Sequence, residues 1–217
     1  MKKILALLLV VALTIGTGCM ALADEEDGLR FQQEYEAENG QLDNSGLYVL
    51  PELQLSADEP FEYEDFEDVE ELLTEGTGVL YLGFPRCPWC RSLVPVMIDA
   101  WKQSGAREEI DYFNALDLRD KRSLAEDGSI VVEQEAAPEY DRLVELLYDW
   151  LGEYEGLNDP TIKRIYFPTV VFVREGQIEY VHIGTVEAQD RGESLTEEEY
   201  DGLVSLFAEH MQGLLDD

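Results

Sequence analysis

The chain has 217 residues, of which 45% are hydrophobic and 10% are aromatic. This composition is sufficient for one full hydrophobic core and excludes a wholly disordered protein. The formal net charge is -33, from 48 acidic and 15 basic residues, which makes nucleic acid and anionic lipid headgroups poor partners. We expect one acidic domain with extensions.

The N-terminus has the pattern of a secretory signal peptide. Lys2 and Lys3 precede an apolar run from Ile4 to Ile15, and small residues then lead to Ala21-Leu22-Ala23. The apolar run is short for a membrane span. We therefore predict a signal peptide over residues 1–23 and an extracytoplasmic protein, either secreted or tethered to the outer face of the cell membrane.

A second processing site lies in the same segment. Gly16-Thr17-Gly18-Cys19 loosely resembles a lipobox, in which the cysteine is lipidated and becomes the mature N-terminus. Gly16 stands where an aliphatic residue is usual, so cleavage after Ala23 is favoured and a lipid anchor at Cys19 is the alternative. Either outcome leaves Cys87 and Cys90 as the cysteines available for redox chemistry.

Residues 24–46 are rich in acidic and amide side chains and show no sustained periodicity, which predicts an acidic flexible linker. The domain proper is predicted over residues 47–217. A strand from Tyr48 to Leu55 is disfavoured by Pro51, which has no amide hydrogen for a sheet.

Residues 47–217 show strand and helix patterns in alternation, with loops predicted at 120–138 and 156–164. The predicted elements, in chain order, are a strand at 61–63, a helix at 66–73, a strand at 78–84, a helix at 88–103 kinked at Pro95, a strand at 110–116, an amphipathic helix with Leu143, Leu147, Trp150, Leu151 and Tyr154 facing the core, strands at 169–173 and 178–183, and a last helix capped by Thr196 and Glu199. Parallel crossovers followed by a hairpin indicate a layered α/β fold, with a helical insertion before the penultimate strand.

The segment Cys87-Pro88-Trp89-Cys90 lies where a predicted buried strand turns into a helix. Unpaired amides and the positive end of the helix dipole stabilise a thiolate at Cys87. Cys90 lies within one helical turn and can attack a mixed disulfide formed at Cys87. Pro88 suits the first helical position, and Trp89 offers a flat apolar contact to a substrate chain.

A structural disulfide and half of a zinc site are the alternatives for this pair. A bridge over two residues removes little unfolded-state entropy, and zinc needs four ligands, whereas His182 and His210 are far apart in the chain. We therefore expect thiol exchange with no metal and no cofactor beyond the redox-active disulfide. His182 is a candidate acid or base, although a packing role is favoured.

Two arginines flank the cysteine pair. Arg86 and Arg91 are candidates for electrostatic support of a thiolate or of an acidic substrate, and the alternative is that they are inert charges facing solvent.

The chain resembles the thioredoxin superfamily from about residue 61 to residue 214. The resemblance rests on the strand Val79–Leu82, the cysteine pair, Pro95, and Phe167-Pro168-Thr169 before the penultimate strand. It implies a thioredoxin fold, which is a central mixed sheet flanked by helices.

The resemblance also implies site residues. Pro168 is expected to be cis and to lie against the redox pair, and the Phe167 backbone is expected to form an edge for an extended substrate peptide. Thioredoxins carry a buried acidic residue six positions before the first cysteine, where this chain has Tyr81. Proton transfer at Cys90 would then need water or another group.

The segment Tyr81-Leu82-Gly83-Phe84-Pro85-Arg86-Cys87-Pro88-Trp89-Cys90-Arg91 is similar to exported thioredoxin-like proteins of Gram-positive bacteria, including those described as bacteriocin transport accessory proteins. This similarity implies disulfide handling of secreted proteins or peptides, together with a redox partner protein. We predict an extracytoplasmic thiol-disulfide oxidoreductase with Trp89, Phe167 and Pro168 at its substrate site. The alternative is a peptide-binding or accessory module without turnover.

Overall fold

The computed structural model describes residues 26–187 and 189–215. The predicted signal peptide and Cys19 lie outside these ranges. Within the described ranges, no helix combines the length and apolar character that a membrane span requires.

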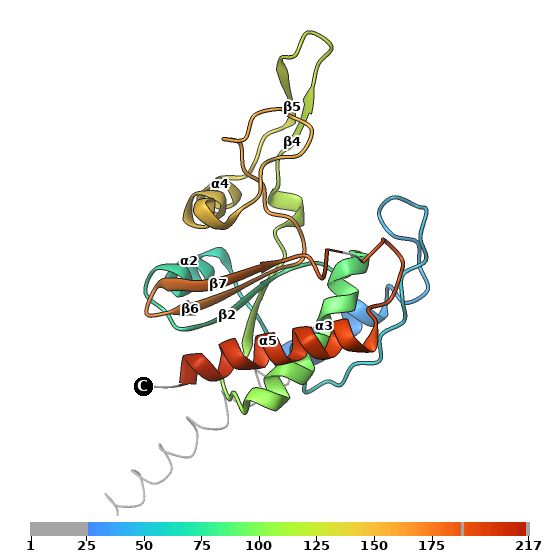
Figure 1. The fold of residues 1–217 in the computed structure, drawn as a ribbon, viewed down its shortest axis with the longest axis vertical. Helices are drawn as coiled ribbons and strands as arrows, with labels where there is room; N and C mark the ends of the chain where they lie inside the picture. Colours follow the sequence, from blue (N-terminus) through green and yellow to red (C-terminus); the bar gives the residue numbers. More distant parts are fainter. Residues whose placement is uncertain (1–25, 188, 216–217) are drawn as a thin grey trace, which may run out of the picture.

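A five-stranded mixed sheet forms the centre of the molecule, in the order β1-β3-β2-β6-β7 (Figure 1). β1 and β2 run parallel to β3, whereas β6 is antiparallel to both β2 and β7. β2 has a strand on each side, and its apolar run is buried, as expected for a central strand covered on both faces. The strands are β1 (Phe61–Tyr63), β2 (Gly78–Leu82), β3 (Ile110–Phe113), β6 (Thr169–Arg174) and β7 (Gln177–Ile183).

Helices cover both faces of the sheet. α3 (Pro88–Ser104) and α5 (Glu197–Leu215) pack against each other, and α5 also contacts β2 and β6. α2 (Phe66–Thr74) lies on the opposite face, above the sheet in Figure 1. The predicted α/β class, with a mixed central sheet flanked by helices, is therefore confirmed.

Local sequence signals account for the ends of the two long helices. Pro88 occupies the first turn of α3, and Gly105 ends this helix in the left-handed region at φ 72°. Before α5, the Thr196 amide donates to Glu199 Oε2 at 2.8 Å and the Glu199 amide donates to Thr196 Oγ1 at 3.3 Å. This reciprocal pair is the predicted capping box.

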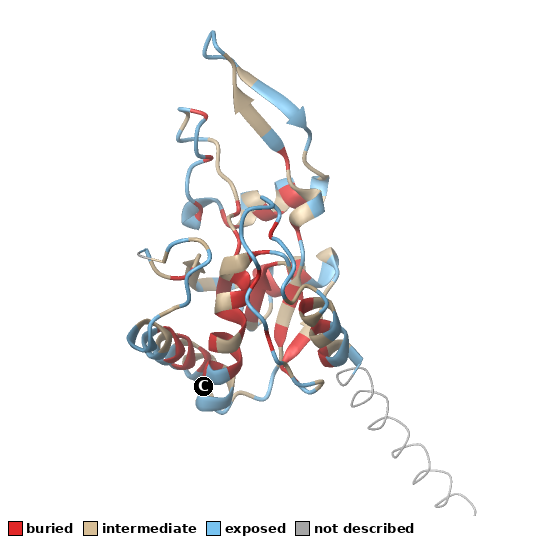
Figure 2. Cartoon of the chain, turned by 90° about the vertical axis from the view of Figure 1, so that its right-hand side faces the viewer, coloured by how far each residue is buried: buried red, intermediate tan, exposed pale blue. Residues whose placement is uncertain are grey.

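The insertion between β3 and β6 differs from the prediction. β4 (Lys121–Leu124) and β5 (Ile130–Gln134) form a separate two-stranded hairpin where a loop was predicted, and it projects away from the main sheet in Figure 1. Figure 2 shows that this hairpin is largely exposed, whereas buried residues gather on the central strands and on α3. Because neither face of the hairpin is buried in the core, its strands lack a clear alternation of apolar and polar residues, and the sequence therefore did not indicate them.

The predicted amphipathic helix is also shorter than expected. α4 (Pro138–Leu146) ends before a 3-10 turn, η2 (Tyr148–Trp150), and Trp150 is exposed instead of facing the core. Leu143, Leu147 and Tyr154 are buried as predicted.

The predicted linker over residues 24–46 does not hold for its described part. Residues 26–36 are helical, and Phe31 and Tyr35 on this helix are fully buried. The Phe31 ring stacks on Phe61 of β1 with centroids 4.0 Å apart. The two aromatic residues are four positions apart and therefore share one helix face, which the surrounding acidic residues obscured.

Candidate active site

Cys87 lies at the junction between β2 and α3, as the N-cap residue of α3. Its sulfur accepts a hydrogen bond from the Cys90 amide at 3.1 Å, and its thiol donates to the Phe167 carbonyl oxygen at 3.7 Å. Both cysteines are free thiols in this structure. The Cys87 sulfur therefore sits among polar backbone groups at the positive end of a helix.

Cys90 is the inner sulfur of the pair. Its side chain is fully buried, and burial raises the pKa of the Cys90 thiol well above its usual range, an effect reinforced by the neighbouring Cys87. Hydrogen bonds from the Phe84 backbone and the Tyr81 hydroxyl act in the opposite direction and favour the thiolate. Cys87 lines an open cavity, whereas Cys90 does not. The two sulfurs therefore have different access to a substrate.

A pair of buried tyrosines lies beneath Cys90. The Tyr81 and Tyr35 hydroxyl oxygens are 2.8 Å apart, and burial raises the pKa of both phenols well above 10, so both groups are neutral hydrogen-bonding groups. A Cβ atom at Gly83 would lie 2.2 Å from the Tyr81 hydroxyl oxygen, so only glycine leaves room for this hydroxyl. Sequence reasoning missed Tyr35 because it lay in the predicted linker. Its four-residue spacing from Phe31 was the available signal.

Phe167 and Pro168 precede β6, and the Phe167 backbone lies beside Cys87. The Phe167–Pro168 peptide bond is cis, as predicted. The Phe167 carbonyl oxygen faces Cys87, and its ring packs edge-to-face on Phe84 with centroids 5.4 Å apart. The structure thus brings the predicted Phe167 backbone edge next to the outer sulfur.

The cavity beside Cys87 has a volume of about 400 Å³. Its walls come from the N-terminal segment, the start of α3, the turn after β3, the residues before β6, and the loop before α5. Trp89, Phe84 and Phe167 provide apolar surface, and Arg119 and Arg191 add positive charge. Neither arginine was singled out from the sequence, because each is distant in the chain from the cysteine pair.

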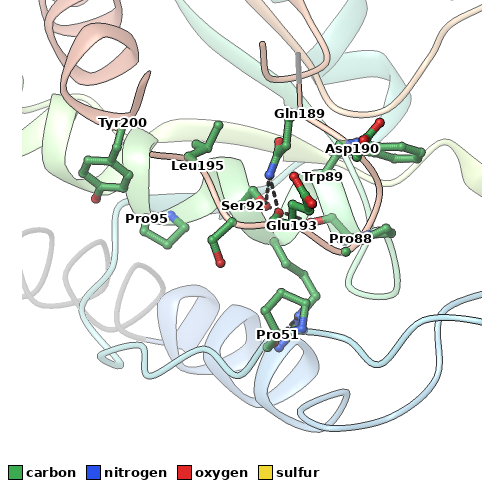
Figure 3. Close-up of a pocket in the computed structure, with 13 residues that line it drawn as sticks. Pro51, Pro88, Trp89, Ser92, Pro95, Gln189, Asp190, Glu193, Leu195 and Tyr200 are labelled. Carbon is green, nitrogen blue, oxygen red and sulfur yellow. Dashed lines mark hydrogen bonds between the residues drawn. The ribbon is translucent and has the colours of Figure 1, made fainter. Parts of the chain in front are cut away.

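Trp89 also borders a second cavity of about 200 Å³ (Figure 3). The loop before α5 closes this cavity through Gln189, whose side-chain amide donates to Ser92 Oγ at 3.1 Å and to the Glu193 carbonyl oxygen at 2.7 Å. Pro51 of the N-terminal segment lines the opposite wall. Trp89 is therefore shared between two hollows that flank the first turn of α3.

The two arginines predicted to flank the pair have different roles. Arg86 lines the cavity of Cys87 and forms an ion pair with Glu38 at 3.3 Å. Arg91 is only 1% exposed and donates to backbone carbonyl oxygens of the N-terminal segment and the loop after β2. These acceptors are the Tyr35 oxygen at 2.7 Å, the Pro51 oxygen at 2.8 Å and the Pro85 oxygen at 3.2 Å, and the Asn39 side chain accepts a further bond.

Arg91 is therefore not the inert charge facing solvent that was the alternative to electrostatic support. Its guanidinium donates these hydrogen bonds to the N-terminal segment and so holds that segment against α3. The hydrophobic neighbours of Arg91 on α3 gave no indication of this, because its acceptors are backbone groups far away in the sequence.

His182 is packed away from the thiols. Its Nε2 lies 2.9 Å from the Thr185 carbonyl oxygen, and its ring packs edge-to-face on Phe207 with centroids 5.0 Å apart. Burial lowers the pKa of His182. His182 does not line the cavity of Cys87, and its contacts agree with the packing role that the sequence favoured.

Comparison with known proteins gives no match: no protein-family model matches the chain, and no curated protein does.

Proposed function

We propose that this chain is an extracytoplasmic thiol-disulfide oxidoreductase with a thioredoxin fold, acting on protein or peptide disulfides through Cys87 and Cys90. The observation that carries the proposal is the asymmetry of the pair. Cys87 caps a helix, lines a cavity and is 3% exposed, while Cys90 lies one turn further along the helix and is fully buried. This is the arrangement that a nucleophilic cysteine and a resolving cysteine require.

The topology supports the fold assignment. The sheet order β1-β3-β2-β6-β7, the cysteine pair after β2 and the cis-proline before β6 are the features expected of a thioredoxin fold. The β4–β5 hairpin and α4 then form an insertion between β3 and β6, and the helix at residues 26–36 is an N-terminal addition.

The proposed reaction exchanges one disulfide for another. The Cys87 thiolate attacks a substrate disulfide, so that a Cys87–substrate bond forms and the second substrate sulfur leaves as a thiolate that takes up a proton. Cys90 attacks the Cys87 sulfur, which forms the Cys87–Cys90 disulfide and releases the first substrate sulfur as a thiolate that takes up the proton lost by Cys90. The substrate is reduced by two electrons and the pair is oxidised. An external dithiol restores the pair, and the reverse sequence oxidises a substrate dithiol.

Tyr81 supports the second step. The raised pKa of Cys90 opposes formation of the attacking thiolate, and the Tyr81 hydroxyl offers it a hydrogen bond in a site closed to water. Tyr35 accepts or donates at the other side of the Tyr81 hydroxyl and holds it in place. Tyr81 thus stands at the position where thioredoxins carry an acidic residue.

Substrate docking involves Trp89, Phe167 and Pro168. An extended peptide that pairs with the Phe167 backbone would bring its cysteine to Cys87, and the Trp89 face would contact the neighbouring side chains. The expected partners are secreted proteins or peptides that carry thiols or disulfides, and a redox partner protein. A mature N-terminus after Ala23, or at a lipidated Cys19, belongs to the same proposal, and intact mass of the exported protein tests it.

The test is a trapping experiment with a fluorescent peptide disulfide. The Cys90→Ser variant should accumulate a mixed disulfide at Cys87, whereas Cys87→Ser should form none and should lose exchange. A matched variant, Ser92→Ala, keeps both sulfurs and should exchange like the wild type. If the wild type and a variant lacking both cysteines bind the peptide equally well, and the wild type does not convert it, the binding-module alternative is established instead.

A further inference from the structure

The cavity beside Cys87 has a charge opposite to that of the whole chain. Its charged lining residues are three arginines, Arg86, Arg119 and Arg191, and one aspartate, Asp43. This local excess of two positive charges occurs in a chain with a formal net charge of -33. A randomly chosen patch on the surface of such an acidic chain is expected to have a net negative charge. The positive charge of the cavity lining is therefore a local feature of the site.

Two of the three arginines already have carboxylate partners. Arg86 pairs with Glu38 at 3.3 Å and donates to the Leu42 carbonyl oxygen at 2.8 Å. Arg191 pairs with Asp43 at 3.5 Å and lies over the Trp89 ring, 4.7 Å from its centroid. Their charges are compensated within the protein.

The Arg119 guanidinium has no such partner. Among residues 26–187 and 189–215, it makes neither a hydrogen bond nor an ion pair, and its guanidinium carbon lies 5.3 Å from the centroid of the Phe167 ring. The adjacent Asp120 carboxylate is engaged by Arg122. Arg119 is half-buried at the end of a 3-10 turn, η1 (Leu116–Leu118), which aims it at the same cavity as Cys87.

The surroundings of Arg119 increase the cost of leaving it unpaired. Burial, and next the neighbouring Arg164, lower the pKa of Arg119, and the weaker influence of Tyr140, Tyr154 and Asp120 acts in the opposite direction. The Nε of Arg164 is itself buried without a hydrogen-bond partner. A partly desolvated guanidinium is stabilised strongly by a carboxylate, which it binds through two parallel hydrogen bonds.

We infer that Arg119 is a specificity-determining residue that pairs with a substrate carboxylate, and that the cavity selects peptide disulfides with an acidic residue next to the reacting cysteine. The inference rests on the proposed exchange function and names its substrate class. Phe167 connects the two parts of the site, because its carbonyl oxygen faces Cys87 while its ring lies beside Arg119. A peptide cysteine at Cys87 would thus present an adjacent side chain to Arg119.

The test compares three homodimeric peptide disulfides that differ only in the residue after cysteine, which is Glu, Gln or Lys. Reduced protein is mixed with each peptide under single-turnover conditions, so that the Cys87–Cys90 dithiol is the only reductant. The wild type should reduce the Glu peptide about tenfold faster than the Gln peptide, and the Lys peptide most slowly. The net charge of the chain alone predicts the reverse order.

Variants separate the local charge from the bulk charge. Arg119→Gln should bring the ratio of Glu-peptide to Gln-peptide rates close to one, Arg119→Lys should keep part of the preference, and Arg119→Glu should invert it. Arg142→Gln is the matched control, because it removes one positive charge from α4, where Arg142 pairs with Glu70 and Glu145. This control should keep the wild-type ratio.

A binding measurement makes the two proposals separable. Affinities of the same peptides with cysteine replaced by serine, measured from tryptophan fluorescence, should show the same preference and the same dependence on Arg119. Acidic preference in binding without any exchange would leave this inference standing and remove the proposed enzyme activity. Exchange with an unchanged ratio in Arg119→Gln, or an equal shift in Arg142→Gln, would overturn the inference and leave the enzyme activity standing.

Discussion

The hydroxyl groups of Tyr35 and Tyr81 meet at 2.8 Å in the buried core, although the two residues are 46 positions apart in the chain. Tyr81 belongs to β2, and Tyr35 belongs to the helix at residues 26–36. This contact makes the N-terminal segment part of the environment of Cys90, whose thiolate the Tyr81 hydroxyl favours.

Tyr81→Phe should therefore slow the resolving step. Loss of a hydrogen bond to a charged sulfur raises the pKa of Cys90 further, and we expect attack on the mixed disulfide to slow by roughly tenfold or more at pH 7. The deficit should shrink as the pH rises, because more Cys90 is then ionised. Stopped-flow measurement of mixed-disulfide decay against pH checks this. Tyr35→Phe should have a smaller effect, and an unchanged decay rate in Tyr81→Phe would exclude the proposed role.

Alkylation should distinguish the two sulfurs. Cys87 lines the cavity, whereas Cys90 is sealed and the pKa of its thiol is well above the usual range. Because the thiolate is the reactive form, iodoacetamide at pH 7 should label Cys87 at least about tenfold faster than Cys90. Peptide mapping by mass spectrometry after short exposure gives the ratio. Equal labelling at early times would contradict the assigned order of the sulfurs.

Arg91→Ala should destabilise the protein and release the N-terminal segment. The substitution removes the Arg91 hydrogen bond to the Pro51 carbonyl oxygen and leaves the Tyr35 carbonyl oxygen with the Glu38 amide at 3.3 Å, and each hydrogen bond lost from a charged donor costs about 1.5 to 3 kcal/mol. We expect a total loss of at least about 3 kcal/mol, measured from urea unfolding, and faster proteolysis within residues 26–36. Arg86→Ala is the matched control, because Arg86 is exposed and should cost less than about 1 kcal/mol.

The stability of the fold should fall as the pH rises from 4 to 8. Burial, with Glu62 and Asp68, raises the pKa of Asp111 to about 7, and burial together with Asp111 raises the pKa of Glu64 to about 8. These carboxyls hold their protons more tightly in the folded state than in the unfolded state. Their stabilising contribution is complete below the unfolded pKa of about 4 and is lost as the pH passes through the folded values.

Asp111→Asn tests this directly, because asparagine carries no charge at any of these pH values. The variant should gain melting temperature relative to the wild type at pH 8, less at pH 5 and little at pH 4, at about 2 to 4 °C for each kcal/mol. Asp117→Asn removes the same charge from an exposed position and should show no such difference. Identical pH profiles for Asp111→Asn and the wild type would disprove the linkage.

Short-range patterns were sufficient for the parts of this protein whose partners are close in the chain. The apolar run of β2, proline at the first turn of α3 and the Thr196–Glu199 capping box each depend on neighbours within one or two turns. Their positions follow from backbone hydrogen bonding and from periodic burial. For the same reason the cysteine pair was found from the sequence, since its two members share one helical turn.

Only the tertiary structure decided which distant side chains surround that pair. Tyr35 became a core residue, Arg91 became a fastening for the N-terminal segment, and Arg119 reached the cavity of Cys87. A long polar side chain has several rotatable bonds and many candidate partners, and its local sequence does not select among them. The choice depends on which carbonyl groups, rings and carboxylates the folded chain places within its reach, and that is a property of the packed sheet and helices together.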